Sequence, residues 1–155
     1  MFDTDIKLVI SPVFYEEYPE IKLLFDDVIK FEGALTEKTI FDLSSDLNIG
    51  EHTIEVHFLN KKMSDTKVEQ GLDKAVIIES IIIEGMDNER FKWAGIYYPN
   101  YPEYITEGIK ELPSTTYLGW NGVWILKLES PIYSWIHKKE YLGWIVEIDK
   151  NLNLS

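Results

Sequence analysis

The chain has 155 residues, the size of one ordinary domain, and carries a formal net charge of −12 because 27 acidic residues outnumber 15 lysines and arginines. The absence of cysteine excludes disulfide frameworks and the thiolate-bound metal sites of zinc fingers and iron–sulfur proteins. The acidic residues are spread along the chain and repel phosphate backbones, so we expect no nucleic-acid partner. The chain starts acidic where a signal peptide is basic, and its most apolar stretch, residues 75–86, is too short to span a bilayer, so we expect no cleaved signal and no membrane partner.

Residues 1–60 predict β-strands with one solvent-exposed face. Apolar and polar residues alternate in three runs, at residues 6–10, 21–25 and 52–58. In the last run, Ile54, Val56 and Phe58 face one side and the polar residues between them face the other. The pair Asp26-Asp27 separates two predicted strands and is typical of a hairpin turn.

Beyond residue 60, the apolar runs 76–78 and 81–83 are β-branched on both faces, as in a central strand that is covered on each side. Helix signals are weak, and only residues 103–112 predict a short helix, which Pro113 would end. The sequence Tyr-Leu-Gly-Trp at residues 117–120 returns at 141–144, and we interpret the two copies as strands or strand entries.

These patterns predict an all-β protein of about eight or nine strands, an antiparallel β-sandwich of jelly-roll or immunoglobulin-like type with at most one short helix. Residues 1–155 form a single sandwich domain in this prediction. The aromatic-rich loop and C-terminal segment, residues 91–155, are expected to pack on the sandwich and to carry its binding function. Residues 1–90 then supply the scaffold.

The sequence shows no catalytic motif. His52 and His57 are an odd number of positions apart on a predicted strand, so they point to opposite faces. No nucleophile elbow, phosphate-binding loop, dinucleotide fingerprint or zinc-protease motif occurs. Acidic residues are so frequent that no pair can be singled out as the carboxylates of a glycosidase. The sequence therefore predicts a protein that is not an enzyme.

The segment after residue 60 holds the candidate metal ligands. Asp65, Glu69 and Asp73 place carboxylate oxygens near the end of a predicted strand, and calcium binds six to eight such oxygens, often from loops. No EF-hand motif is present, and neighbouring lysines such as Lys61 and Lys62 would weaken the site. We therefore expect no cofactor, with calcium at these three carboxylates as the alternative.

Aromatic residues make up 14% of the chain and concentrate after residue 90. A single core does not easily take so many amphipathic rings, whose polar ends need water or a hydrogen-bond partner. Exposed Trp and Tyr on a rigid β scaffold suit either stacking on sugar rings or anchoring of a protein–protein interface. The alternative is that these rings cover an edge of the core. The candidate binding residues are Trp93, Tyr97, Tyr98, Tyr101, Trp120 and Trp135.

Two segments resemble the immunoglobulin-like or carbohydrate-module-like sandwich domains of virion structural proteins from marine tailed phages, especially cyanophages. They are IKLLFDDVIKFEGALTEKTIFDLSSDLNIGEHTIEVHFL at residues 21–59 and DKAVIIESIIIEGM at 73–86. The sequence YLGWNGVWILKLESPIYSWIHKKEYLGW at 117–144 resembles a segment that accompanies this domain in the same proteins. The shared motifs are patterns of strand and turn and contain no active-site signature.

This resemblance implies a virion component that is assembled in the host cytoplasm, as a capsid decoration or as a tail or baseplate accessory protein. Its partners would be other virion proteins, in multiple copies, and its function would be protein–protein assembly. Similar sandwiches in xylan-binding modules hold sugars with calcium and loop carboxylates. They imply the alternative function of a carbohydrate-binding module for a host-surface glycan, assisted by calcium, with Trp93, Tyr97, Tyr98 or Tyr101 as the stacking platform.

Overall fold

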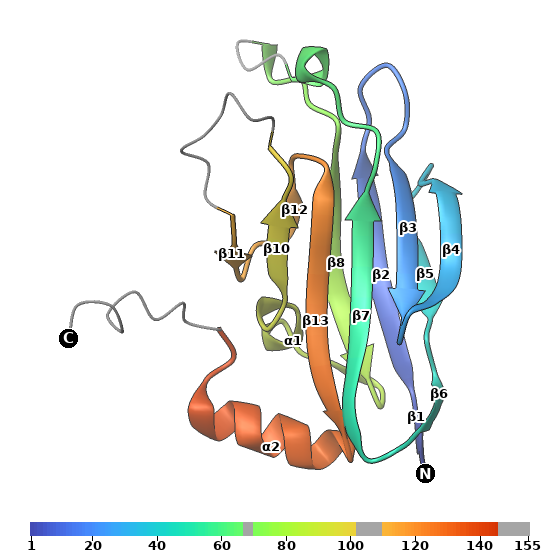
Figure 1. Ribbon diagram of the computed structural model, residues 1–155, viewed down its shortest axis with the longest axis vertical. Coiled ribbons are helices and arrows are strands. Elements are labelled where there is room, and N and C mark those ends of the chain that lie inside the picture. The colour runs from blue at the N-terminus through green and yellow to red at the C-terminus, as the bar shows by residue number, and fades with distance from the viewer. Residues whose placement is uncertain (67–69, 102–109, 146–155) are drawn as a thin grey trace, which may run out of the picture.

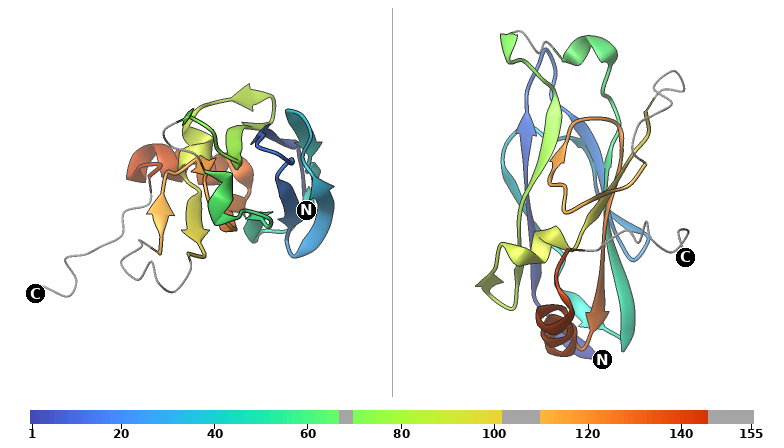
Figure 2. Two further views of the ribbon diagram at one scale, coloured as in Figure 1. Left: turned by 90° about the horizontal axis from the view of Figure 1, so that it is seen from above. Right: turned by 90° about the vertical axis from the view of Figure 1, so that its left-hand side faces the viewer.

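The computed structural model describes residues 1–66, 70–101 and 110–145 and shows two β-sheets packed face to face (Figure 1). Figure 2 shows the two layers from the side. The strand pairs of both sheets are antiparallel throughout the described residues. The chain therefore forms an antiparallel β-sandwich, which confirms the fold class predicted from the alternation. Within the same residues, no helix has the length and apolar character needed to cross a membrane.

The larger sheet has six strands in the spatial order β11 (Leu112–Pro113), β10 (Ile96–Pro99), β13 (Gly122–Ser130), β7 (Gly50–Phe58), β3 (Glu20–Phe25) and β4 (Val28–Ala34). The smaller sheet has the order β12 (Tyr117–Leu118), β8 (Ala75–Ile83), β2 (Ile6–Val13) and β5 (Thr39–Asp42), and β9 (Met86–Asp87) also pairs with β8. A separate pair joins β1 (Phe2–Thr4) to β6 (Ser45–Leu47). The helical elements are the 3₁₀ turn η1 (Met63–Asp65), α1 (Arg90–Trp93) and α2 (Ile132–Leu142).

The core lies between the two sheets and is built from alternate residues of their strands. In β13, Trp124, Leu126 and Leu128 are fully buried, whereas the residues between them are partly or wholly exposed. The inward residues predicted for β7 are buried in the same way. Burying one such large side chain contributes about 1.5–3 kcal/mol to folding. The two-residue period of the strands therefore supplies most of the core.

The segment after residue 90 is part of the sandwich, which corrects the prediction that residues 91–155 pack on a scaffold formed by residues 1–90. Strand β13 lies between β10 and β7 in the middle of the larger sheet. It pairs with β7 over nine residues, from Gly122 opposite Phe58 to Ser130 opposite Gly50. The Trp124 side chain is among the largest buried side chains of the core. The scaffold is therefore incomplete without this segment.

The helix α2 differs from the prediction that both Tyr-Leu-Gly-Trp sequences form strands or strand entries. The second copy instead ends α2, and Gly143, with φ of 104°, follows its last turn. Ile132, Trp135 and Ile136 form one apolar face at helical spacing and pack on the core. Most of the predicted helix at 103–112 lies outside the described residues, and Leu112 belongs to strand β11. The interpretation of the second copy as a strand is wrong because helical spacing, not alternation, matches the burial of this segment.

His52 connects β7 to the hairpin between β3 and β4. Its ring Nδ1 lies 2.6 Å from Asp26 Oδ2, and its Nε2 lies 2.8 Å from the Asn48 carbonyl oxygen. A neutral imidazole carries one N–H, so only the protonated ring donates to both oxygens. Burial lowers the pKa of His52, but Asp26 and the Asn48 carbonyl raise it more, and the pKa lies above its ordinary value of 6.5. Protonated His52 therefore stabilises the folded chain.

We expect the free energy of unfolding to fall as the pH rises from about 6.5 through the raised pKa of His52, with a slope of at most about 1.4 kcal/mol per pH unit from this group. A group whose pKa is raised by folding stabilises the folded state at pH values below its pKa in the unfolded chain. This contribution is lost as the pH rises through its pKa in the folded chain. Urea unfolding between pH 5.5 and 9 measures it. His52→Gln should abolish this component and His57→Gln, on the opposite face of β7, should keep it. An unchanged slope in His52→Gln would contradict the assignment.

Gly95 lies against the Trp124 indole ring, and a Cβ atom at this position would overlap the ring. We therefore expect Gly95→Ala to destabilise the fold by about 1–3 kcal/mol in urea unfolding, because the buried ring must move. Gly119→Ala is the matched control, since its Cβ would meet only the edge of Tyr117 at 3.5 Å. Equal stability of the two variants would show that Trp124 does not restrict the backbone at Gly95.

Candidate functional site

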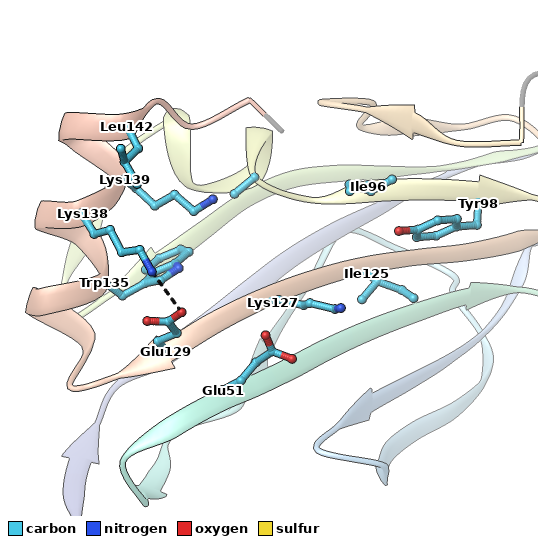
Figure 3. Close-up of a pocket in the computed structure, with 11 residues that line it drawn as sticks. Glu51, Ile96, Tyr98, Ile125, Lys127, Glu129, Trp135, Lys138, Lys139 and Leu142 are labelled. Atoms are coloured by element: carbon cyan, nitrogen blue, oxygen red, sulfur yellow. Dashed lines mark ion pairs between the residues drawn. The ribbon is translucent and has the colours of Figure 1, made fainter. Parts of the chain in front are cut away.

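A groove of about 330 Å³ lies between α2 and the outward face of the larger sheet. Its size falls in the range of sites for small ligands, roughly 300–1,000 Å³. Figure 3 shows its walls, with α2 on one side and strands β10, β13 and β7 on the other. The lining residues are Glu51, Ala94, Ile96, Tyr98, Ile125, Lys127, Glu129, Trp135, Lys138, Lys139 and Leu142.

Alternate residues of β13 point into the core and into this groove. Ile125, Lys127 and Glu129 point away from the core because their neighbours in the strand are buried. On β10, Ile96 and Tyr98 share this outward face, and Ile96 lies opposite Ile125 in the strand register. Two apolar side chains from adjacent strands therefore form the floor of the groove.

An aromatic cluster fixes α2 above the sheet. The Trp135 ring is 3% exposed and packs edge-on against Trp144 at a centroid distance of 5.4 Å. Trp144 in turn packs against Phe91 of α1 at 5.3 Å. Side chains that α2 presents to the sheet, including Lys138 and Lys139, are thereby held over the groove (Figure 3). The wall is rigid because its anchor is part of the core.

Tyr98 supplies the half-buried aromatic ring of the groove. Burial, together with the charge of Glu111, raises the pKa of its phenol, so the hydroxyl keeps its proton at neutral pH. The residue thus offers an apolar ring face and a hydrogen-bond donor next to Ile96 and Ile125. A ligand with both an apolar face and hydroxyl groups matches this combination.

Charged side chains surround the apolar floor. Lys138 Nζ lies 3.5 Å from Glu129 Oε1, which joins α2 to β13 across the groove. Glu51 lies opposite Glu129 in the register of β7 and β13. Lys127 and Lys139 also line the groove. None of these charged residues belongs to the site predicted from the sequence, although the alternation in residues 123–130 indicates that Lys127 and Glu129 point outward.

The structure separates the six predicted aromatic residues. Tyr98 and Trp135 line the groove, although Trp135 is nearly buried. Tyr97 is 1% exposed, its hydroxyl donates to the Trp120 carbonyl, and burial raises its pKa, so its assignment to a stacking platform is corrected. Trp120 and Tyr101 are half-buried and stack on each other at a centroid distance of 6.4 Å, and neither lines the groove.

Trp93 lies in a second, more open hollow of about 590 Å³ on the other side of Leu142. Trp144 and Ile145 share its lining, and Arg90 Nη1 is paired there with Glu140 Oε2 at 3.0 Å. Because its two charged groups bind each other, this hollow offers fewer free polar groups to a ligand than the groove does. The groove is therefore the better candidate site.

Two of the predicted calcium ligands, Asp65 and Asp73, lie in the segment between β7 and β8 and bind lysines. Lys74 Nζ, which is fully buried, lies 2.8 Å from Asp65 Oδ2 and 2.8 Å from Glu17 Oε1. Burial lowers the pKa of Lys74, but these carboxylates raise it more. Burial likewise raises the pKa of Asp65, and hydrogen bonds from Lys74 and the Lys62 backbone lower it below its usual value. Both groups are therefore charged at neutral pH.

Asp73 is bound by a second buried lysine. The ammonium group of Lys61 donates to Asp73 and to the Lys74 carbonyl. The Tyr117 hydroxyl donates to Asp73 Oδ2 at 2.5 Å, and Thr66 Oγ1 donates to Oδ1 at 2.7 Å. Glu69 lies outside the described residues, which contain no group of three His, Asp or Glu side chains placed to hold a metal. Asp65 and Asp73 do not fit a calcium site, because ammonium groups occupy their oxygens and would repel the ion.

We expect Lys74→Met to destabilise the fold by about 3–5 kcal/mol, because it leaves the buried Asp65 carboxylate without its cation. Urea unfolding measures the loss. Lys62→Met is the control, since this side chain is 68% exposed and its nearest carboxylate, on Glu17, is 3.6 Å away. The double variant Lys74→Met with Asp65→Leu should recover most of the stability. A loss below about 1 kcal/mol in Lys74→Met would contradict the buried ion pair.

A scan against models of protein families and a search of curated proteins gave no match. Among solved structures, the fold is similar to the carbohydrate-binding module vCBM60 in complex with galactobiose, with a TM-score of 0.51 and 14% sequence identity over 79% of this chain and 96% of that one. A second vCBM60 structure gives a TM-score of 0.50 and 14% identity over 79% of this chain and 89% of that one. Its description concerns circular permutation as an evolutionary link between two families of calcium-dependent carbohydrate-binding modules. At this identity the similarity shows that the chain has the β-sandwich fold of such modules.

Proposed function

We propose that the chain is a non-catalytic carbohydrate-binding module that holds a glycan in the groove between α2 and the larger sheet. The observation that carries the proposal is the Tyr98 ring, which lies beside the apolar floor of Ile96 and Ile125 and within a rim of charged groups. A sugar ring has an apolar face and a hydroxylated edge. The apolar floor and the Tyr98 ring can pack against the apolar face of the sugar, and the charged groups of the rim can form hydrogen bonds with its hydroxyl groups.

The similar fold supports this proposal, because vCBM60 binds galactobiose on the same kind of sandwich. The groove requires no catalytic group for binding. Its two carboxylates belong to Glu51 and Glu129, and the second is paired with Lys138. Glu129 therefore already has a partner within the groove. Binding without turnover is therefore the function that the groove supports best.

We further propose that this binding does not use calcium. The predicted calcium ligands Asp65 and Asp73 are bound to Lys74 and Lys61, and the segment between β7 and β8 to which they belong lies at the far end of the sandwich from α2 (Figure 1). Calcium prefers six to eight oxygen ligands, and the groove lining contributes only two carboxylates. The chain thus differs in this proposal from the calcium dependence described for the similar modules.

The role in a phage particle stays a prediction that rests on the sequence resemblance. Assembly with other virion proteins and location in the virion belong to the same prediction. Glycan binding is compatible with that role, since a virion protein can contact a host-surface glycan. Mass spectrometry of purified particles measures the protein in virions, and its absence from intact particles would exclude the structural role.

We expect Tyr98→Ala to weaken glycan binding by about 2 kcal/mol, roughly thirtyfold, because the variant removes the ring against which the sugar packs. Isothermal titration calorimetry of the full chain against a panel of oligosaccharides that includes galactobiose measures the change. Tyr133→Ala is the matched control, since Tyr133 is 62% exposed on α2 and does not line the groove. Tyr98→Phe, which keeps the ring, should retain most of the affinity.

The same titrations test the other parts of the proposal. EDTA should leave the affinity unchanged, and an affinity that EDTA abolishes would contradict calcium-independent binding. New reducing ends after incubation with a bound oligosaccharide would contradict a non-catalytic module. Equal affinity of Tyr98→Ala and the unchanged chain, with both folded, would exclude the groove as the site.

A further inference from the structure

The groove concentrates positive charge in a strongly acidic protein. Three of the five charged side chains in its lining are lysines, although the chain carries a net charge of −12. Lys138 is paired with Glu129, whereas Lys127 and Lys139 form no ion pair within the part of the chain that the structure describes. The two remaining ammonium groups come from opposite walls, Lys127 from β13 and Lys139 from α2 (Figure 3).

The carboxylates of the groove do not cancel this charge. Glu129 is neutralised by Lys138 at 3.5 Å. Glu51 lies directly opposite Glu129 on β7 and is exposed. A single free carboxylate therefore faces two free ammonium groups. The five charged groups of the lining sum to a charge of about +1, and the two ammonium groups without a partner favour an anion between them.

We infer that the groove selects an anionic glycan, whose carboxylate or sulfate group binds Lys127 and Lys139 while a sugar ring packs on Tyr98. This inference rests on the proposed glycan-binding function and adds the class of ligand. Hydrogen bonds from ammonium groups to an anion are shorter and stronger than neutral ones. A neutral sugar would cover the same two ammonium groups without giving them a countercharge, so it binds less well.

The test compares three ligands of equal length with the full chain at low salt: an oligogalacturonate, a sulfated galactan oligosaccharide and a neutral galacto-oligosaccharide. We expect at least one anionic ligand to bind about tenfold more tightly than the neutral one, and the preferred anion identifies the group that is bound. Raising the salt concentration should reduce this preference. Lys127→Met and Lys139→Met should each weaken anionic binding by about fivefold and change neutral binding much less, because only the anion supplies a countercharge to the ammonium group that is removed.

Lys30→Met is the matched control, because Lys30 is exposed on β4 at the far edge of the same sheet. Neutral and anionic ligands that bind equally well through Tyr98 would overturn the inference and leave the proposed function intact. Anionic binding that neither Lys127→Met nor Lys139→Met weakens would also overturn it. A hexaglutamate peptide that binds as tightly as the oligogalacturonate would overturn the assignment to a glycan. The failure of every oligosaccharide to bind would instead overturn the proposed function itself.

Discussion

The register of β13 against β7 is the constraint on which both the core and the groove depend. Nine consecutive pairs join the two strands, and inward and outward residues alternate along them. Trp124 and Leu126 enter the core, and Ile125 and Lys127 enter the groove. A slip by one residue would exchange the two sets, burying a lysine and exposing a tryptophan. The cost of that exchange holds the groove-facing side chains of β13 on the outward face of the sheet.

Lysines have opposite roles at the two ends of the sandwich. At one end, Lys61 and Lys74 are buried and bind carboxylates that join the segment before β8 to its surroundings. At the other end, Lys127 and Lys139 face the groove without a carboxylate partner in the described residues. A buried ammonium group without a partner would destabilise the fold, whereas a partly exposed one retains its water until a ligand arrives. Burial therefore separates the structural lysines from those that we propose for binding.

The similarity to carbohydrate-binding modules concerns the β-sandwich scaffold. The choice of a ligand would depend on the side chains that point outward from its sheets. A β-sandwich presents one outward face per sheet, and the side chains on that face can change without altering the core. Here α2 adds a wall to that face, anchored by Trp135 and Trp144. The helix converts an open sheet surface into a groove, and Lys139 of the helix adds its charge there to that of Lys127 from β13.

The strands that have local signals could be predicted from the amino-acid sequence alone. The alternation around Ile54 predicted β7, and Asp26-Asp27 predicted the hairpin between β3 and β4, in which both residues adopt positive φ. Which aromatic rings are exposed could not be predicted in this way, because alternation places Tyr97 and Tyr98 on opposite faces but only the pairing of β10 with β13 shows that Tyr97 faces the core and Tyr98 the groove. The groove itself joins β7, β10, β13 and α2, and no local pattern shows which distant segments will share a face. Strand pairing and helix packing decide that, because they depend on contacts between residues far apart in the chain.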